Sequence, residues 1–376
     1  MRTRLSILAA ALLVCPPAAT LAQAPLPSNA TVYVSGLEGP RGLAFAPDGT
    51  LYVAEGGLGG ATSTVGSCRQ VPAPVGPYKG GLTARISKVD SNGTRTTLTS
   101  GLPSALDGQG NIIGTAGLAF LNGNLYALLA GGGCSHGNSN SPNAVIQVNL
   151  QNGQSTQIAN LSQYITQNPG QYTNAGDYEP DGSWYGLIAY RGFLLAIEAN
   201  HGQIVGIAPG GGVLDLLDLS SSNGHIVPTS IVATNTNLYV GNFTPAPFIP
   251  EAARVLTVSL EAFLYDPLPG FTLPSFGLGS LRVAGSKAGF TTITGMALGP
   301  DGLLYVLELA TGGGITPGTG KVVRVNRSGG IDDVVTGLTV PTGLTFGPDG
   351  ALYVSNLGAA PGPAGQILRV SVTPAQ

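Results

Sequence analysis

Short apolar strands alternate with tight polar turns along this chain, and one such pattern recurs six times. Each copy has a small residue, an apolar strand, a turn of the Asp-Gly type and a second strand resembling Leu-Tyr-Val. The copies span residues 42–55, 117–129, 186–198, 230–242, 295–308 and 343–356. Asp-Gly between two apolar runs is a strong signal for a hairpin. The repeat therefore predicts six similar units, each opening with a hairpin.

A second hairpin follows the first in most copies. It covers residues 86–98, 144–158, 203–217 and 321–335, and the version at 253–264 is the least regular. Two hairpins give four strands per unit. Four-stranded sheets repeated six times are typical of a β-propeller, in which each sheet is one blade. We therefore predict an all-β, six-bladed propeller with four-stranded blades.

The two ends of the repeat predict how the ring closes. The sixth copy stops after three strands, at residues 366–372, whereas residues 31–37 form a solitary strand before the first copy. That strand resembles the fourth strands of other copies. We expect it to complete the last blade, which leaves no free sheet edge. Residues 23–376 should then form a single domain.

The composition agrees with this fold class. The 376 residues include 58 glycines and 28 prolines, 43% are hydrophobic and 9% are charged. Glycine and proline are the poorest helix formers, which argues against a helical bundle. High hydrophobicity with few charges argues against a disordered chain.

The N-terminus is typical of a secretory signal peptide over residues 1–22. Arg2 and Arg4 precede an apolar run at 5–15, which is too short to span a bilayer, and Ala22 ends a small-residue cleavage site. We therefore expect a secreted or periplasmic protein without a membrane span. Without Arg2 and Arg4, 14 basic residues face 19 acidic ones, so a nucleic-acid partner is not expected. We expect a monomer.

Two cysteines, Cys68 and Cys134, remain after the signal peptide. In an oxidising compartment a single pair favours a disulfide over a reactive thiol or a metal site. Both fall in long loops of neighbouring blades, where a bridge could join them.

All long insertions are predicted on one face of the disc. If the strands of a blade are named A to D from the axis outward, the A–B and C–D turns are short. The insertions are B–C connections at 56–83, 130–143, 243–252, 309–320 and 357–364, and D–A connections at 103–115, 161–184 and 265–289. We call this the elaborated face. Loops on a rigid scaffold carry function, so a site for a small molecule or a protein partner is expected here.

The B strands also end at the elaborated face, and five of their six last residues carry a side-chain oxygen. These residues are Glu55, Leu129, Glu198, Asn242, Glu308 and Asn356. One interpretation is a set of metal ligands around the channel, because Ca²⁺ prefers oxygen ligands. The other is that each oxygen accepts backbone N–H groups where the next A strand begins.

Further candidates cluster near the third blade. Trp184 and Tyr178 lie in an insertion rich in acids, and aromatic faces beside carboxylates suit a sugar or planar ring. With Glu198, Asn200 and Phe243 they form the predicted ligand-binding set. His201, next to the ring of B-strand ends, is the candidate general base. Residues 133–137 match the Gly-x-Ser-x-Gly pattern of a nucleophile elbow, but they fall in a loop without a following helix.

The chain resembles the ScyD/ScyE family of secreted propellers, which are related to NHL-repeat and sugar-lactonase-like propellers. The matching segments are residues 39–57, 76–89, 179–187, 227–255, 290–308 and 340–356. The resemblance implies an exported protein without an established catalytic activity. Related sugar lactonases hold a metal on Glu, Asn and Asp ligands in the channel. Here Leu129 interrupts the ring and no Asp stands in it, so that site is not carried over.

Three functions follow from these observations. The first is a non-enzymatic or accessory propeller that binds a small molecule or a partner through the elaborated face. The second is a calcium-dependent hydrolase of lactones or esters, with His201 or a metal-bound water as base. The third is a structural scaffold.

Overall fold

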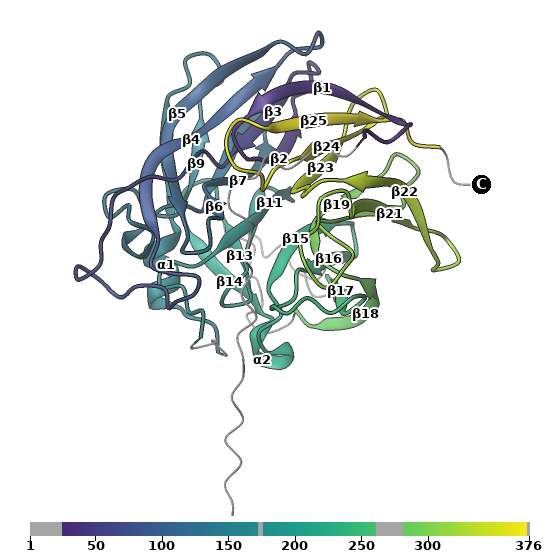
Figure 1. Ribbon diagram of the computed structural model, residues 1–376. Coiled ribbons are helices and arrows are strands. Elements are labelled where there is room, and N and C mark those ends of the chain that lie inside the picture. The colour runs from purple at the N-terminus through teal and green to yellow at the C-terminus, as the bar shows by residue number, and fades with distance from the viewer. Residues whose placement is uncertain (1–24, 172–175, 261–280, 374–376) are drawn as a thin grey trace, which may run out of the picture.

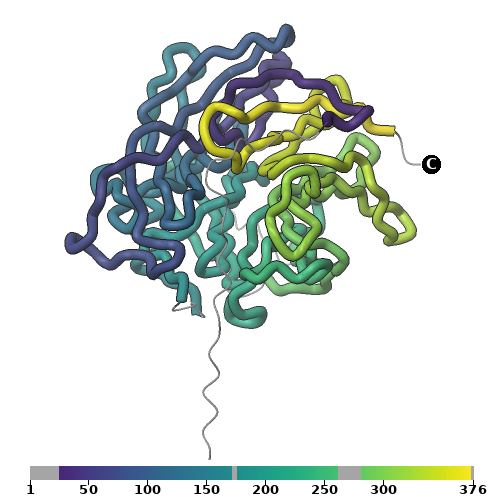
Figure 2. The backbone as a smooth tube through the Cα atoms, viewed as in Figure 1, coloured from purple at the N-terminus to yellow at the C-terminus, as the bar shows by residue number. Residues whose placement is uncertain are grey.

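The computed structural model describes residues 25–171, 176–260 and 281–373. They form six β-sheets arranged around a common axis (Figures 1 and 2). The predicted six-bladed propeller of four-stranded blades is confirmed. The expected signal peptide, residues 1–22, lies outside the described residues.

Each blade runs from an inner A strand to an outer D strand. Blade 1 contains β2 (Pro40–Phe45), β3 (Leu51–Glu55), β4 (Lys79–Val89), β5 (Arg95–Leu106) and β6 (Ile112–Ile113); blade 2 contains β7 (Thr115–Leu121), β8 (Asn124–Leu129), β9 (Ala144–Val148) and β10 (Ser155–Asn160); blade 3 contains β11 (Trp184–Tyr190), β12 (Phe193–Glu198), β13 (Gln203–Ile207) and β14 (Val213–Asp218).

The second half of the ring follows the same order. Blade 4 contains β15 (Pro228–Ala233), β16 (Asn237–Asn242), β17 (Ala253–Ser259) and β18 (Val283–Phe290); blade 5 contains β19 (Ile293–Leu298), β20 (Leu304–Glu308), β21 (Gly320–Val325) and β22 (Ile331–Leu338); blade 6 contains β23 (Gly343–Phe346), β24 (Leu352–Asn356) and β25 (Gly365–Val370), with β1 (Ala30–Leu37) as its outer strand.

The first strand closes the ring as predicted. β1 pairs antiparallel with β25, from Ala30 opposite Val370 to Leu37 opposite Gly365. In Figure 1 this strand, in purple, lies beside the yellow strands of the last blade. The closure leaves blade 6 assembled from both ends of the described chain.

Blade 1 is larger than the repeat predicts. β4 and β5 extend beyond the expected strands, and β6 adds a fifth strand paired with β5. The extension occupies sequence that the repeat assigned to loops, because residues 79–83 and 103–106 are strand rather than insertion. It adds to the side of the molecule that carries the other insertions.

Within the described residues, helical structure is confined to short segments. α1 (Leu161–Gln167) is capped by Asn160, whose side chain accepts the Gln163 N–H, and α2 (Ser220–Asn223) is a single turn. A 3₁₀ turn covers Cys134–His136. None of the helices in the described ranges is long and apolar enough to cross a bilayer.

The six A strands surround a central channel with a volume of about 360 Å³. Figure 1 shows their labels β2, β7, β11, β15, β19 and β23 gathered around the axis. Apolar clusters fill the space between neighbouring blades, where the repeated tyrosines Tyr52, Tyr126, Tyr305 and Tyr353 are buried. The channel is therefore the axis of a rigid, well-packed ring.

Candidate functional site

A disulfide joins two insertions of the elaborated face. Cys68 and Cys134 are bonded with an S–S distance of 2.12 Å and lie 66 residues apart in sequence. The prediction of this bridge is confirmed. It ties the B–C insertion of blade 1 to that of blade 2.

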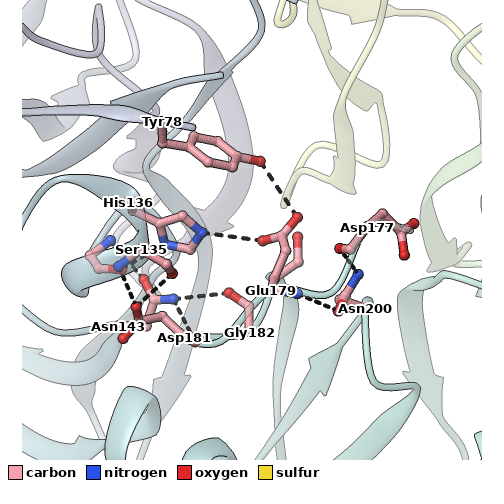
Figure 3. A network of polar contacts seen from close by, with 12 residues as sticks. Tyr78, Ser135, His136, Asn143, Asp177, Glu179, Asp181, Gly182 and Asn200 are labelled. Atoms are coloured by element: carbon pink, nitrogen blue, oxygen red, sulfur yellow. Dashed lines mark hydrogen bonds and ion pairs between the residues drawn. The ribbon is translucent and has the colours of Figure 1, made fainter. Parts of the chain in front are cut away.

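The residue after Cys134 contacts the insertion that precedes blade 3. Both the backbone N–H and the hydroxyl of Ser135 donate to Asp181 Oδ2, at 2.8 and 2.6 Å (Figure 3). Both residues are buried. A charge-assisted pair of this kind fixes the two insertions to one another.

His136 makes a second link between the same insertions. Its Nε2 lies 3.2 Å from Glu179 Oε2, and its Nδ1 lies 2.6 Å from the Gly132 carbonyl oxygen. The Tyr78 hydroxyl points at Glu179 from blade 1, at 3.5 Å, as Figure 3 shows. Burial lowers the pKa of His136, but the hydrogen bond and charge of Glu179 outweigh it and raise that pKa above its ordinary value.

The polar contacts continue toward blade 3. Asn143 Nδ2 donates to the carbonyl oxygens of Asp181 and Gly182, and Asn200 Oδ1 accepts the Glu179 N–H at 2.9 Å. Asn200 Nδ2 donates to the Asp177 carbonyl oxygen. Three blades thus share one network, drawn in Figure 3, which we call the three-blade network.

The three ring glutamates are engaged within their own blades. Glu55 accepts the Glu38 N–H at 2.7 Å and pairs with Arg95 at 2.8 Å. Glu198 accepts N–H groups from Ser183, Asn200 and His201. Glu308 accepts the Thr291 N–H at 2.7 Å. Burial raises the pKa values of Glu198 and Glu308.

The two ring asparagines behave in the same way. Asn242 donates to the Ile226 carbonyl oxygen and accepts the Arg254 N–H, and Asn356 accepts the Thr339 N–H at 2.8 Å. Ile226 and Thr339 lie just before the A strands of blades 4 and 6. The N–H donors to the three glutamates include residues at the same place in their blades. The geometry therefore matches the backbone-capping interpretation of this repeated position.

A metal does not fit this ring. Each of the five oxygen-bearing side chains is turned to its own blade and accepts at least one backbone N–H. Glu55 also pairs with Arg95, and Glu308 with Lys321. Across the described ranges, no three His, Cys, Asp or Glu side chains form a group that could hold a metal ion.

Three other predicted site residues are positioned by packing. His201 is fully buried, with Nε2 on the Glu179 carbonyl oxygen and Nδ1 facing the Gly170 N–H, so neither ring nitrogen is free to act as a base. Trp184 is 1% exposed and packs in the core between blades 2 and 3, so it cannot stack on a ligand. Phe243 packs against Phe248 and an apolar cluster above blades 5 and 6.

Tyr178 is the predicted aromatic residue that remains accessible. Its ring is partly exposed, and the guanidinium carbon of Arg69 lies 3.9 Å from the ring centre. The centre of the His201 ring lies 5.0 Å from the centre of the Tyr178 ring. The sequence did not indicate the contact with Arg69, which directly follows the disulfide-bonded Cys68 in the chain.

The Gly-x-Ser-x-Gly segment has no catalytic geometry. The Ser135 hydroxyl donates to a carboxylate, and the adjacent His136 ring is held by Gly132 and Glu179. These residues hold loops together instead. Asp181 and Glu179 belong to the acidic insertion singled out in the sequence, but their partners Ser135 and His136 could not be paired with them from spacing.

Comparisons with known proteins establish the fold. The chain is similar to regucalcin, a calcium-binding protein from Agrobacterium tumefaciens (15% identity, 93% of this chain and 94% of that chain, TM-score 0.53). It is also similar to a putative oxidoreductase (glucose dehydrogenase) from Thermus thermophilus (15% identity, 91% and 99%, TM-score 0.52) and to a protein of unknown function from Bacteroides thetaiotaomicron (11% identity, 92% and 76%, TM-score 0.55). No family model matches the sequence, and neither does any curated protein. At 11 to 15% identity these likenesses support the propeller fold alone, and the resemblance to the ScyD/ScyE family stays a prediction.

Proposed function

We propose that this chain is an exported, non-catalytic propeller of the ScyD/ScyE type that binds a small molecule or a protein partner on its elaborated face. The observation that carries the proposal is the three-blade network together with the disulfide. Insertions of blades 1, 2 and 3 are fixed to one another by a covalent bond and buried polar contacts. A surface fixed in this way loses little conformational entropy when a ligand binds.

Two features of this surface suit a ligand. A pocket of about 320 Å³ opens beside the disulfide, with Gly133, Ser139, Asn160 and Gln163 in its wall, and pockets of this size hold small molecules. Next to Cys68 in the chain, the exposed Arg69 presents a cation to solvent over the partly exposed Tyr178 ring. Both features belong to insertions, where binding residues are expected.

The alternative is a calcium-dependent hydrolase of lactones or esters. Regucalcin, which shares the fold, is a calcium-binding protein. In this chain, however, the proposed ligands Glu55, Glu198 and Glu308 accept backbone N–H groups, and the proposed base His201 is buried with both nitrogens engaged. Binding is therefore the function that we favour.

The test combines metal analysis with binding and turnover measurements on the purified protein. Monosaccharides and planar aromatic compounds are screened by thermal shift, and those that stabilise the protein are titrated into Arg69→Ala. The matched control is Arg191→Ala, which removes a similar contact, 5.3 Å from the Tyr190 ring, on the opposite face. We expect affinity to fall in Arg69→Ala and to persist in Arg191→Ala. Bound calcium with lactone or aryl-ester turnover that Glu198→Ala abolishes would establish the hydrolase instead.

A further inference from the structure

Asp181 is a buried acid that uses only one of its two carboxylate oxygens inside the fold. Its Oδ2 accepts both donors of Ser135, whereas its Oδ1 accepts no hydrogen bond from the described residues. Asp181 is 9% exposed, yet Oδ1 is not one of the fully buried side-chain atoms that lack a partner. Oδ1 is therefore an unused acceptor that a ligand can still reach.

Other buried acids have either a basic neighbour or a donor on both oxygens. Glu55 and Glu308 each pair with a basic side chain. Glu198 accepts backbone N–H groups on both of its oxygens. Asp181 has neither of these, because no lysine or arginine of the described ranges pairs with it. A buried charge without a partner is costly, so a cation at Oδ1 would supply what the fold lacks.

His136 does not supply the missing positive charge. The charge of Asp181 contributes to the raised pKa of His136, but His136 Nε2 lies 3.2 Å from Glu179 Oε2. A protonated His136 can balance only one of the two carboxylates. The acidic insertion thus carries one more negative charge at this point than its buried neighbours neutralise.

The position of the Asp181 carboxylate is fixed by its surroundings. Ser135 holds the carboxylate, and Asn143 Nδ2 donates to the backbone carbonyl oxygen of Asp181 at 2.9 Å, as Figure 3 shows. A Cβ atom on Gly133 would lie only 2.1 Å from Asp181 Cγ, so a glycine is required beside the carboxylate. Oδ1 is consequently held in place before any ligand arrives, as a binding group should be.

A pocket of about 320 Å³ lies at this carboxylate. Its wall is formed by the B–C insertion of blade 2, by α1 and by Asp181, and pockets of this size hold small molecules. Of the described residues in the wall, Asp181 is the charged one. The neutral polar side chains of the wall are Ser139, Asn160, Ser162, Gln163, Thr166 and Gln167.

The wall suits a polar ligand with a positive charge. Gln163 and Gln167 are exposed, and their side-chain amides make no hydrogen bond to another described residue. An amide both donates and accepts, which matches the hydroxyl groups of a ligand. None of the described lining residues is aromatic, so the wall lacks the flat face on which a neutral sugar ring stacks. The carboxylate and the amides together favour an amine that carries hydroxyl groups.

We propose that the pocket beside Asp181 binds a small hydroxylated primary amine, whose ammonium group donates to Asp181 Oδ1. An ammonium has three N–H donors, and its bond to a carboxylate is stronger than a neutral hydrogen bond. The amides of Gln163 and Gln167 receive the hydroxyl groups. The inference rests on the proposed binding function and names a ligand class for this pocket. In the alternative, Asp181 only joins the two insertions.

The experiment titrates glucosamine into the full purified protein by calorimetry, at a mildly acidic pH that keeps the amine protonated. Glucose and N-acetylglucosamine keep the hydroxylated ring without the charge, and cyclohexylamine keeps the charge without the hydroxyl groups. We expect glucosamine to bind at least about tenfold more tightly than each of these three, the discrimination typical of a charged hydrogen bond. Equal affinities for glucosamine and glucose would indicate a neutral-sugar site and overturn the proposal, as would no binding of glucosamine.

Variants then locate the ammonium group. Asp181→Asn keeps an oxygen for the Ser135 donors and removes the charge, and it should lose about tenfold or more in glucosamine affinity. Asp48→Asn, at an exposed turn, is the matched control and should bind like the original protein. Gln163→Ala should lose about threefold. Its control is Gln151→Ala, in the exposed C–D turn of blade 2 on the opposite face.

A further variant keeps the proposal testable if Asp181→Asn does not fold. Ser139 is exposed in the pocket wall, so Ser139→Trp fills the pocket without removing a contact of Asp181. Glucosamine affinity should fall by about tenfold or more in this variant. Unchanged affinity in folded Ser139→Trp or folded Asp181→Asn contradicts the site.

The two proposals can fail separately. Binding of neutral sugars or aromatic compounds that needs Arg69, with no glucosamine binding, would leave the elaborated face as a binding surface and reject the amine site. Glucosamine binding that depends on Asp181, with no effect of Arg69→Ala, would support the pocket and reject the role proposed for Arg69.

Discussion

Ser135 and Asp181 are joined twice through a single carboxylate oxygen, because the Ser135 N–H and hydroxyl both donate to Asp181 Oδ2 at 2.8 and 2.6 Å. Ser135 belongs to blade 2 and Asp181 to the insertion before blade 3. The pair is buried, so neither donor has water as a substitute partner. The blade 2 insertion is consequently joined to the insertion before blade 3 by a buried polar contact.

Replacing Asp181 by Ala should destabilise the protein substantially. Two buried donors of Ser135 would lose their acceptor, and each unsatisfied buried group costs about 1 to 3 kcal/mol. We expect the free energy of unfolding, measured in urea, to fall by about 3 kcal/mol. Asp48→Ala is the control, because Asp48 is exposed and accepts only a local turn N–H from Thr50. Equal losses in both variants would contradict the role assigned to Asp181.

Removing the disulfide should weaken the same region. In the chain-entropy model a bridge between Cys68 and Cys134, 66 residues apart, stabilises the fold by about 4 kcal/mol. The double variant Cys68→Ser/Cys134→Ser should lose roughly this amount in urea unfolding. A reductant should reproduce the loss in the original protein and have no effect on the variant. An unchanged midpoint after complete reduction would show that the bridge adds nothing to stability.

Much of the fold could be predicted because each hairpin is specified by a short stretch of sequence, and that stretch recurs six times. The residue that ends each B strand was placed correctly from the repeat, and β3, β12 and β20 end at Glu55, Glu198 and Glu308. The closing strand followed from a missing fourth strand in the last copy. Periodicity carries such information because every blade must bury the same face.

The site was less predictable because its contacts join segments that share no pattern. Ser135 and Asp181 meet through two irregular insertions, and no spacing rule pairs them. The acidic surroundings of Trp184 predict a ligand residue, but Trp184 is the first residue of β11 and pairs with Glu198 in the sheet. The position of Trp184 is determined by packing in the core between blades 2 and 3, which its neighbours in sequence do not indicate.

Glu198 should behave as a backbone-capping residue, and chelation should have no effect. Three N–H donors converge on its carboxylate, and an amide offers one oxygen in place of two. Glu198→Gln should therefore lose about 2 kcal/mol in urea unfolding, whereas Glu251→Gln, at an exposed position, should change little. EDTA should leave the Tm of the original protein unchanged. A Tm that falls with EDTA and recovers with calcium would instead indicate a metal at the ring.

Stability should decrease as pH rises above neutrality, and His136 should be a main cause. Glu179, Asp181 and Tyr78 face its ring. Burial lowers the pKa of His136, but the hydrogen bond and charge of Glu179, with the charge of Asp181, raise it above the ordinary 6.5. The folded protein therefore holds this proton more tightly than the unfolded chain. The stabilisation is complete below about 6.5 and is lost as pH rises through the folded pKa.

His225 contributes with the same sign, because Asp177 raises its pKa against the effect of burial. The free energy of unfolding of the original protein should thus be higher at pH 6 than at pH 9. His136→Gln and His225→Gln should each remove part of this slope, and the double variant should remove more than either. Four acids also have a raised pKa, Asp107 and Asp215 from 3.8 and Glu198 and Glu308 from 4.5. They remain in both variants as a common background. A slope that is identical in the original protein and the double variant would show that neither histidine is stabilised by its carboxylate.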